Sequence, residues 1–473
     1  MDLNTQIKNI KKLLSNYKKV QIWDYTEFKS ASQIATITQL QNEQNYQGLI
    51  KFWQETCKND YFELQHPIEY VVITRAVANL QDGELNLILM IDEFEEFPFL
   101  IIQNNCLINF VITPDRIYRT SYTHIVPNGL LSAAKRIMRH TKNFENLWKY
   151  KDAKFGFYLY HPRPRHYLLE QLAPLININP TKYIKVKQCF YLPNNLNILC
   201  DKNPPPPEKI PSVFLFPTTL NILNQHNHTL TIPSNILIKQ SLQECKINKD
   251  NFDLILWFGI PSERREWVEA KDGILKIIEQ YLLYFNSIKI YLDGLTAFEN
   301  APFNTPFPIL HKELIENLNT LNKNGKKVEA ISLHGATYKL KISYFSSVDC
   351  AITESSSTGI VPLDIYRSDN CVLFGPIFYN TELVSYIPQN AKIANENLIK
   401  IVNFKQFGYF KYHIPWQHLY NLSADILEKI KQVKITRLQV PPMEQILLKA
   451  DSNAQVHKNN IFTKLARIFK IPT

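Results

Sequence analysis

Glycine is scarce in this 473-residue sequence, which contains only 12, whereas an average chain carries roughly 7% glycine. Because glycine adopts backbone conformations that other residues avoid, the few that are present should mark constrained turns. Seven of the twelve fall in one quarter of the chain, which predicts that such turns are concentrated there. They are Gly259, Gly273, Gly294, Gly325, Gly335, Gly359 and Gly375.

The sequence also lacks the marks of several protein classes. No run of about 18 apolar residues is present, and the segment 1–19 has no apolar signal-peptide core, so neither a membrane span nor secretion is expected. The seven cysteines are scattered without a CxxC pair, which is typical of reduced thiols in a cytosolic protein and predicts no disulfide framework and no metal site. No GxGxxG follows a predicted strand and no GxxxxGK[ST] occurs, which disfavours a dehydrogenase and a P-loop enzyme.

The composition is that of a globular protein with a basic balance. Hydrophobic residues make up 45% of the chain and charged residues 20%, which excludes a disordered chain. Lys and Arg outnumber Asp and Glu by 53 to 43, so an anionic partner such as nucleic acid, acidic lipid or a phosphorylated substrate is favoured. There is no long basic block, and we therefore expect no nucleic-acid partner.

A proline-rich segment, "DKNPPPPEKIP" (201–211), predicts a stiff linker between two halves. After it, apolar strand-like runs alternate with amphipathic helical segments, which predicts a doubly wound parallel sheet in the domain 212–420, with helices in 421–473. The first half, 1–200, is less regular, and we expect a second α/β domain. The strand-like runs of the second half are 212–217, 252–259, 287–293, 327–333, 348–353 and 371–375; those of the first half are 20–23, 85–91, 106–113, 155–160 and 184–190.

Ligands of open α/β sheets bind beyond the carboxyl ends of the strands, so the residues that follow each run are candidates for a site. Each also has a structural explanation: an Asp-Gly turn, a satisfied histidine, solvated arginines, or hydroxyls that cap a helix. The hydroxyl-rich turn in "AITESSSTGIVPLDIY" (351–366) suits a cap and a phosphate site equally well. The candidates are Gly259 with Arg264 and Arg265, Asp293 with Gly294, His334 with Gly335, the segment 354–359, and Gly375.

The succession "ISLHGATYKLKISYFSSVDCAITESSSTGIVPLDIY" (331–366) resembles the nucleotide-sugar half of GT-B glycosyltransferases. The resemblance implies two Rossmann-like doubly wound domains facing a central cleft, with a nucleotide-sugar as co-substrate and no other cofactor. It covers about 210–400 well and the first half only in outline. It assigns the donor phosphate to Ser356, Ser357, Thr358 and Gly359, charge neutralisation to Arg264 or Arg265, the donor ribose to Asp364, and further donor contacts to Asp293, His334 and Gly335.

Two departures from that family bear on mechanism and donor. Retaining members often carry two glutamates with seven residues between them, but the residue at that separation before Asp364 is Ser356, so an inverting reaction is preferred. The paired serines, the Asp-Gly and the strand-end histidine are also similar to bacterial sialyltransferases. Their usual His-Pro is His334-Gly335 here, which leaves the donor open.

An inverting transfer needs a general base, which the first half should supply. In "FYLYHPRPRHYLLEQLAPL" (157–175) a strand ends in His161, and a histidine can take a proton from an acceptor hydroxyl near neutral pH. Arg163, Arg165 and His166 would suit an anionic acceptor, although a basic surface loop explains them equally. Asp24, after the first predicted strand, is a rival base.

The leading hypothesis is thus a cytoplasmic glycosyltransferase of surface polysaccharide, lipopolysaccharide or capsule synthesis. An epimerase and a non-catalytic partner of a glycosyltransferase, which binds glycan or protein, are the alternatives. The segment 459–473 has apolar residues at helical spacing with Lys and Arg beside them. Such a helix can either bind the anionic inner face of the cytoplasmic membrane or pack on the protein.

Overall fold

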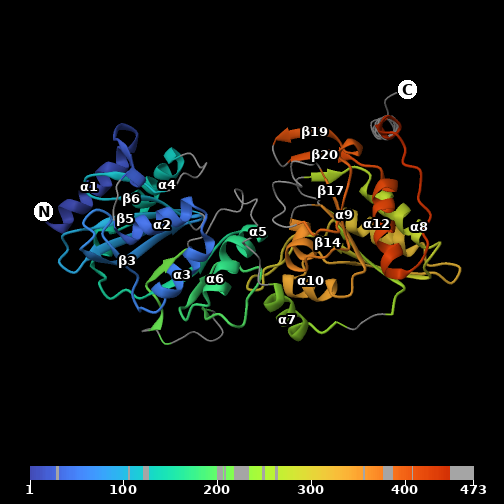
Figure 1. The fold of residues 1–473 in the computed structure, drawn as a ribbon, viewed down its shortest axis with the longest axis horizontal. Helices are drawn as coiled ribbons and strands as arrows, with labels where there is room; N and C mark the ends of the chain where they lie inside the picture. Colours follow the sequence, from blue (N-terminus) through green and yellow to red (C-terminus); the bar gives the residue numbers. More distant parts are fainter. Residues whose placement is uncertain are drawn as a thin grey trace, which may run out of the picture. The chain divides into compact units, whose positions relative to one another are not determined.

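The computed structural model describes residues 1–27, 31–104, 107–120, 127–199, 206, 209–217, 234–247, 251–260, 265–354, 357–375, 387–406 and 409–447. The chain forms two compact units (Figure 1). The first consists of Met1–Gln240 with Phe298–Pro302, and the second of Ser241–Ala297 with Phe303–Thr473. Arg264, Ser356, most of the predicted linker and the tail 459–473 lie outside the described residues.

The second unit contains the parallel sheet that the sequence predicts. Its six strands lie in the order β15-β14-β12-β16-β17-β18, and every neighbouring pair is parallel. Five of them coincide closely with the predicted runs, because a parallel strand buried on both faces is apolar almost throughout. The strands are β12 (Leu254–Gly259), β14 (Ser287–Asp293), β15 (Lys327–Ser332), β16 (Cys350–Glu354), β17 (Cys371–Phe374) and β18 (Lys392–Ile393).

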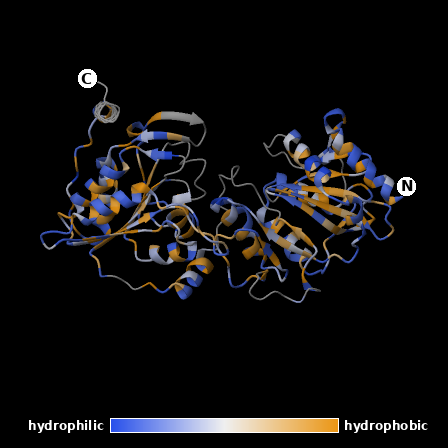
Figure 2. Cartoon of the chain, turned by 180° about the vertical axis from the view of Figure 1, so that it is seen from behind, coloured by the Kyte–Doolittle hydropathy of each residue, from blue (hydrophilic) through white to orange (hydrophobic). Residues whose placement is uncertain are grey.

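Helices cover both faces of this sheet. Leu256 and Phe258 of β12 lie in one core with α8 (Ala270–Tyr281), α9 (Ile309–Asn319) and α12 (Trp416–Lys431). Trp257 between them points to the other face, where its ring contacts Phe345 of α10 (Tyr338–Phe345). The doubly wound arrangement predicted for this half is therefore confirmed. Figure 2 shows the hydrophobic residues concentrated in the strands.

A small sheet accompanies the large one. It contains β13 (Arg265–Trp267), β20 (Tyr409–His413) and β19 (Lys400–Gln406) in that order. Arg265, a candidate after the predicted strand 252–259, opens β13, and α8 begins only at Ala270. The Trp267 indole N–H donates to the Ile414 carbonyl at 3.1 Å and ties β13 to the chain after β20.

The first unit is not the doubly wound parallel domain that we expected. Its larger sheet has seven strands in the order β1-β7-β6-β5-β4-β3-β2, and only β1 and β7 are parallel. The cause is short connections, since parallel neighbours need crossovers of about a dozen residues. Only Gly83 and Glu84 separate β3 from β4, and Gly83 has a φ of 55°. The strands are β1 (Ile22–Asp24), β2 (Glu63–Gln65), β3 (Ile73–Asp82), β4 (Leu85–Asp92), β5 (Phe99–Asn104), β6 (Leu107–Ile112) and β7 (Ile117–Arg119).

Helices α1 and α4 pack together on this sheet. The Asp2 side chain accepts from the Thr5 N–H and begins α1 (Leu3–Ser15), whose buried Ile7, Ile10 and Leu14 recur at helical spacing. They share one core with Leu131 of α4 (Pro127–His140) and with the sheet. The remaining elements before β8 are η1 (Tyr17–Lys19), η2 (Tyr25–Glu27), α2 (Gln33–Asn42), α3 (Tyr46–Thr56) and η3 (Phe144–Lys149).

A second sheet in the first unit is parallel, in the order β10-β9-β8-β11. Its strands are β8 (Phe155–Leu159), β9 (Ile184–Val186), β10 (Ile198–Leu199) and β11 (Val213–Leu215). The strand β11 was expected to begin the second domain, but Val213 pairs with Phe155 of β8. The observed division, within α7 (Ser234–Glu244), therefore lies downstream of the expected boundary at 211/212. No helix in the described part of the chain is long and apolar enough to cross a bilayer.

Candidate functional site

The carboxyl ends of the six-stranded sheet bring several predicted residues to one edge. The strand order reverses between β12 and β16, which is the topological switch point where such sheets bind ligands. Gly259 at the end of β12 is level with Asp293 on β14 and with Thr353 on β16. The predicted alignment along one edge is thus confirmed, whereas the ligand roles of these residues stay predictions.

Gly259 is required by two threonine side chains. A Cβ on this residue would lie 2.1 Å from Thr353 Oγ1 and 2.9 Å from Thr358 Cβ. Thr358 is 6% exposed, and its hydroxyl donates to the Glu354 carbonyl at 3.3 Å. This hydroxyl is therefore engaged with the protein backbone, and Ser357 is the exposed hydroxyl of the described turn. The turn leads into one 3-10 turn, η7 (Ser357–Gly359), and a π-helix, η8 (Ile360–Ile365).

Arg265 contacts a buried carboxylate. Its Nε lies 3.1 Å from Oε2 of Glu354, the last residue of β16, whose side chain is wholly buried. Gly375, with a φ of 115°, leaves room for Glu354, because a Cβ there would lie 3.0 Å from Glu354 Cγ. The predicted role of Arg265 in neutralising a phosphate stays a prediction, and any phosphate would share this cation with Glu354.

Asp293 also has a partner within the protein. One of its carboxylate oxygens lies 2.6 Å from Lys341 Nζ, and both side chains are almost fully buried. Lys341 donates further to the Gly294 carbonyl at 2.6 Å and to Thr296 Oγ1 at 2.8 Å. Burial raises the pKa of Asp293 and lowers that of Lys341. This pair fixes the turn after β14, so a donor contact by Asp293 stays a prediction.

His334, two residues beyond Ser332 at the end of β15, differs from these residues. Both of its ring nitrogens are buried, and neither has a hydrogen-bond partner among the described residues. Its ring lies edge-on to Phe303, with centroids 5.0 Å apart. The next residue, Gly335, has a φ of 81°, and a Cβ there would lie 2.9 Å from Phe303 Cδ1. The Leu333–Gly335 turn thus holds the His334 ring against Phe303.

A second histidine lies beside His334. The His311 ring is 6.3 Å from the His334 ring between centroids, and its Nδ1 lies 2.7 Å from Ser332 Oγ. Burial, with the nearby His334, lowers the pKa of His311 to about 4, so its ring is neutral at pH 7. His311 Nε2 is buried without a partner in the described part of the chain. Two histidines therefore offer polar atoms at the ends of β14 and β15.

Asp364 lies within the π-helix η8 and is 5% exposed. Burial raises the pKa of Tyr338, and the Asp293 and Asp364 carboxylates raise it further. Asp364 is thus close enough to Tyr338 of α10 to act on it through charge. A contact between Asp364 and a donor ribose stays a prediction.

In the first unit, the predicted acceptor residues follow β8. His161 is 2% exposed, its Nδ1 accepts from the Arg163 N–H at 3.1 Å, and its Nε2 lies 3.2 Å from Glu84 Oε1. Both nitrogens of His161 are thus engaged. The contact with His161 lowers the pKa of Glu84. The His166 ring stacks on His161, with centroids 4.5 Å apart.

His166 has the more exposed ring of the two. Its Nδ1 lies 2.8 Å from Oε1 of Glu170, whose side chain is 2% exposed. Nothing in the described part of the chain bonds its Nε2. His166 ends the short helix α5 (Pro164–His166), and Glu170 lies in the π-helix η4 (Tyr167–Leu172), which leads into α6 (Ala173–Ile178). Arg163 is exposed and Arg165 half-buried.

Asp24, the rival base, is held in a local turn. Its Oδ1 accepts from the backbone N–H of Thr26 at 3.0 Å and from the Thr26 hydroxyl at 2.8 Å. Its Oδ2 lies 3.7 Å from Arg119 on the adjacent strand β7. These contacts account for Asp24 structurally, and its role as a base stays a prediction.

Three residues at these sites were missed by sequence reasoning: Glu170, His311 and Lys341. Glu170 follows His166 by four residues, which places the two on one helical face, so this pair could have been found. The other two have no sequence signal of their own, because their partners are distant along the chain. Among the described residues, no three potential metal ligands are gathered into a site.

Comparison with known proteins identifies no family. No protein-family model and no curated protein matches the chain. Among solved structures, the glycosyl transferase family 9 protein from Veillonella parvula DSM 2008 aligns at 12% identity over 60% of this chain and 77% of its own, with a TM-score of 0.22. TarM aligns at 11% identity over 90% of this chain and 82% of its own, with a TM-score of 0.20. Similarities this low carry no argument about fold or function.

Proposed function

We propose that this protein transfers a sugar from a nucleotide-sugar donor to a cell-surface glycan or lipid-linked acceptor, by an inverting, metal-independent reaction. The proposal depends on His334, whose two buried ring nitrogens have no partner among the described residues at the carboxyl edge of a parallel sheet. Buried polar atoms without partners are uncommon in folded proteins. A donor phosphate would supply the missing acceptor for one N–H, and such charge-assisted bonds are strong.

The remaining residues predicted to contact the donor fall into two groups: those open to a ligand and those already in contact with the protein. Ser357 is exposed and can bind a phosphate oxygen, whereas the space beside Gly335 is filled by Phe303. Arg265, Asp293 and Thr358 are already engaged with the protein. This engagement favours one second candidate, a non-catalytic partner that binds a glycan. Binding of a nucleotide-sugar without turnover would identify it.

The test is nucleotide binding by the full chain. CMP, UDP, GDP and ADP should be compared for the rise they cause in melting temperature, since a ligand at 100 times its Kd stabilises the folded state by about 2.7 kcal/mol. His334→Ala should weaken the effective nucleotide by roughly tenfold or more, as expected for loss of a charge-assisted bond worth about 1.5–3 kcal/mol.

His418→Ala is the matched control, because this histidine lies in the same unit and already accepts from the Asn395 N–H. The proposal fails if none of the four nucleotides stabilises the protein. It also fails if His334→Ala binds the effective nucleotide as well as the control does.

For the general base we propose His166 in place of His161. A neutral histidine that donates from Nδ1 to a carboxylate presents Nε2 as the proton acceptor. His166 has this arrangement with Glu170, whereas both His161 nitrogens are engaged. Nε2 of His166 would take the proton of the acceptor hydroxyl while Glu170 orients the ring. His161 would position His166 by stacking.

Loss of the base should act on turnover and spare donor binding. His166→Ala should lower transfer, or donor hydrolysis without acceptor, by about 10²–10⁴-fold, the usual contribution of general base catalysis. Glu170→Gln keeps the shape of the side chain but removes its charge, and a smaller loss is expected. If His161→Ala abolishes turnover while His166→Ala leaves it intact, the assignment reverts to His161.

We further propose that the protein acts in the cytoplasm, at the inner face of the membrane where lipid-linked acceptors lie. The association was expected to come from the tail 459–473, which lies outside the described residues. Removal of this tail should abolish sedimentation with anionic vesicles and leave nucleotide binding unchanged. Unfolding of the truncated protein would assign the tail to the core instead.

A further inference from the structure

The positive charge of the chain is concentrated in two segments. Residues 3–23 contain five lysines, and residues 116–144 contain six Lys and Arg. Neither segment contains an Asp or a Glu, so they hold eleven of the 53 cations and none of the 43 acids. The rest of the chain, with 42 cations against 43 acids, is close to neutral. The basic excess is therefore concentrated locally, although the sequence has no long basic block.

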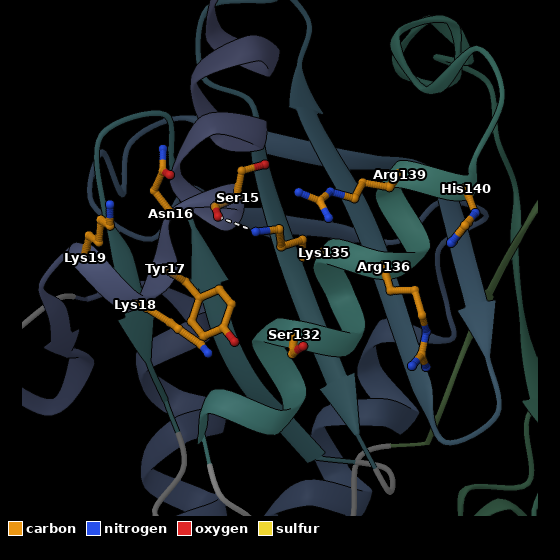
Figure 3. Close-up of a pocket in the computed structure, with 10 residues that line it drawn as sticks. All are labelled: Ser15, Asn16, Tyr17, Lys18, Lys19, Ser132, Lys135, Arg136, Arg139 and His140. Carbon is orange, nitrogen blue, oxygen red and sulfur yellow. Dashed lines mark hydrogen bonds between the residues drawn. The ribbon is translucent and has the colours of Figure 1, made fainter.

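The fold brings these two segments together around one pocket. Helix α4 carries Ser132, Lys135, Arg136 and Arg139 at helical spacing on one face, while its Leu131, Ala134 and Met138 are buried in the core shared with α1. The end of α1 and the turn η1 supply the opposite wall (Figure 3). The pocket has a volume of about 440 Å³ and is lined by Ser15, Asn16, Tyr17, Lys18, Lys19, Ser132, Lys135, Arg136, Arg139 and His140.

The pocket has five permanent cations and no carboxylate in its lining. Lys135 donates to the Ser15 carbonyl at 2.5 Å, which ties α4 to the end of α1. Arg136 lies 3.2 Å from Asp82, but both side chains are more than half exposed, so this pair is weak. Lys18, Lys19 and Arg139 have no ion-pair partner among the described residues. Lys135 and Arg139 are four residues apart on one helix, where like charges repel.

A structural explanation accounts for only part of this charge. Cations in the last turn of a helix are stabilised by its dipole, which applies to Arg139 and His140 at the end of α4. Lys18 and Lys19 lie beyond the end of α1, and Lys135 and Arg136 lie before the last turn of α4. An anion in the pocket would offset the repulsion among these side chains.

We infer that this basic pocket binds a phosphate group, carried either by a free phosphorylated molecule or by an anionic lipid headgroup. Its volume is within the range of about 300–1,000 Å³ found for small-molecule sites. Lys and Arg supply charge-assisted donors for phosphate oxygens, and the Ser132 and Tyr17 hydroxyls add neutral donors. None of the lining residues belongs to the proposed donor or acceptor elements, so the inference goes beyond the proposed function and does not depend on it.

The first test uses inorganic pyrophosphate as the probe, titrated calorimetrically into the full chain. The double variant Lys18→Gln/Arg139→Gln should bind it at least about tenfold more weakly, since each charge-assisted contact is worth that much or more. Lys51→Gln/Lys187→Gln is the matched control, because it removes the same charge from exposed positions outside the pocket. Raising the salt concentration should weaken binding in parallel.

The second arm identifies the source of the phosphate. If the group belongs to a lipid, the pocket variant should bind phosphatidylglycerol vesicles at least about tenfold more weakly than the wild type and the control, because any contact made by the tail 459–473 is common to all three proteins. Pyrophosphate binding that is weakened in the pocket variant, with equal vesicle binding by the three proteins, assigns the group to a free molecule. The inference is overturned if the wild type binds neither probe, or if the pocket variant and the control lose binding equally.

Two further outcomes also decide the question. If only a single-stranded RNA depends on Lys18 and Arg139, the surface is a nucleic-acid site and the inference is wrong. If pyrophosphate binding is lost in His334→Ala but kept in the pocket variant, the probe occupies the proposed donor site and the inference again fails. Melting temperatures should be checked for each variant, and Lys19→Gln, at an exposed position, replaces the double variant if that does not fold.

Discussion

At the scale of single residues, the sequence predicts which polar side chains reach the edge of the sheet but not which of them are available to a ligand. Asp293 and His334 both follow apolar strands and are equal candidates by pattern. The structure separates them, because Asp293 has Lys341 as a buried partner and His334 has none among the described residues. Such partners are set by tertiary contacts between distant segments, and no local pattern encodes them.

The buried pair of Asp293 and Lys341 should be important for stability. Lys341→Met leaves the Asp293 carboxylate buried without its cation, and removal of one partner of a buried pair typically costs about 3–5 kcal/mol. Lys276→Met is the control, since its exposed pair with Glu279 should be worth no more than about 1 kcal/mol. Urea denaturation measures both. Equal stabilities of the two variants would contradict the structural role of the pair.

At the scale of elements, the strands that were predicted correctly are those buried on both faces, because burial leaves a continuous run of apolar residues in the sequence. The strands β12, β14, β15, β16 and β17 were predicted because both faces are covered and nearly every residue is apolar. In the first half, β3 and β5 were not predicted, although Asp82-Gly83 between β3 and β4 is a dipeptide typical of a hairpin turn. The π-helices η4 and η8 could not be predicted, because their apolar residues fit an α-helical period equally well. Such helices are rare and are often found at functional sites.

The close approach of β12 and β16 yields a prediction at this scale. Gly259→Ala would place a Cβ 2.1 Å from Thr353 Oγ1, so the two strands must separate, and a loss of about 1–3 kcal/mol or more is expected. Gly129→Ala in α4, which meets nothing within 4 Å, should instead stabilise by up to about 1 kcal/mol. Thermal unfolding compares them. If Gly259→Ala is as stable as the wild type, the ends of β12 and β16 do not pack as closely as the structure shows.

At the scale of the whole molecule, the chain divides into two units with different sheets. The six-stranded parallel sheet and His334 belong to the second unit, whereas the basic pocket and the His166–Glu170 pair belong to the first. The sequence predicted two domains but placed the boundary before β11, because an apolar strand after a proline-rich segment does not reveal which sheet it joins. The net charge of the whole chain likewise did not reveal that basic residues are concentrated in two segments of the first unit.

The central claim is that the second unit binds the nucleotide of the donor at the ends of β14 and β15. Hydrogen exchange of the full chain, measured with and without the nucleotide that raises its melting temperature, tests this most directly. We predict slower exchange in the segments 293–297 and 333–336 of the wild type, and no such change in His334→Ala. Unchanged exchange in both segments at saturating nucleotide, or slowing confined to the first unit, would contradict the claim.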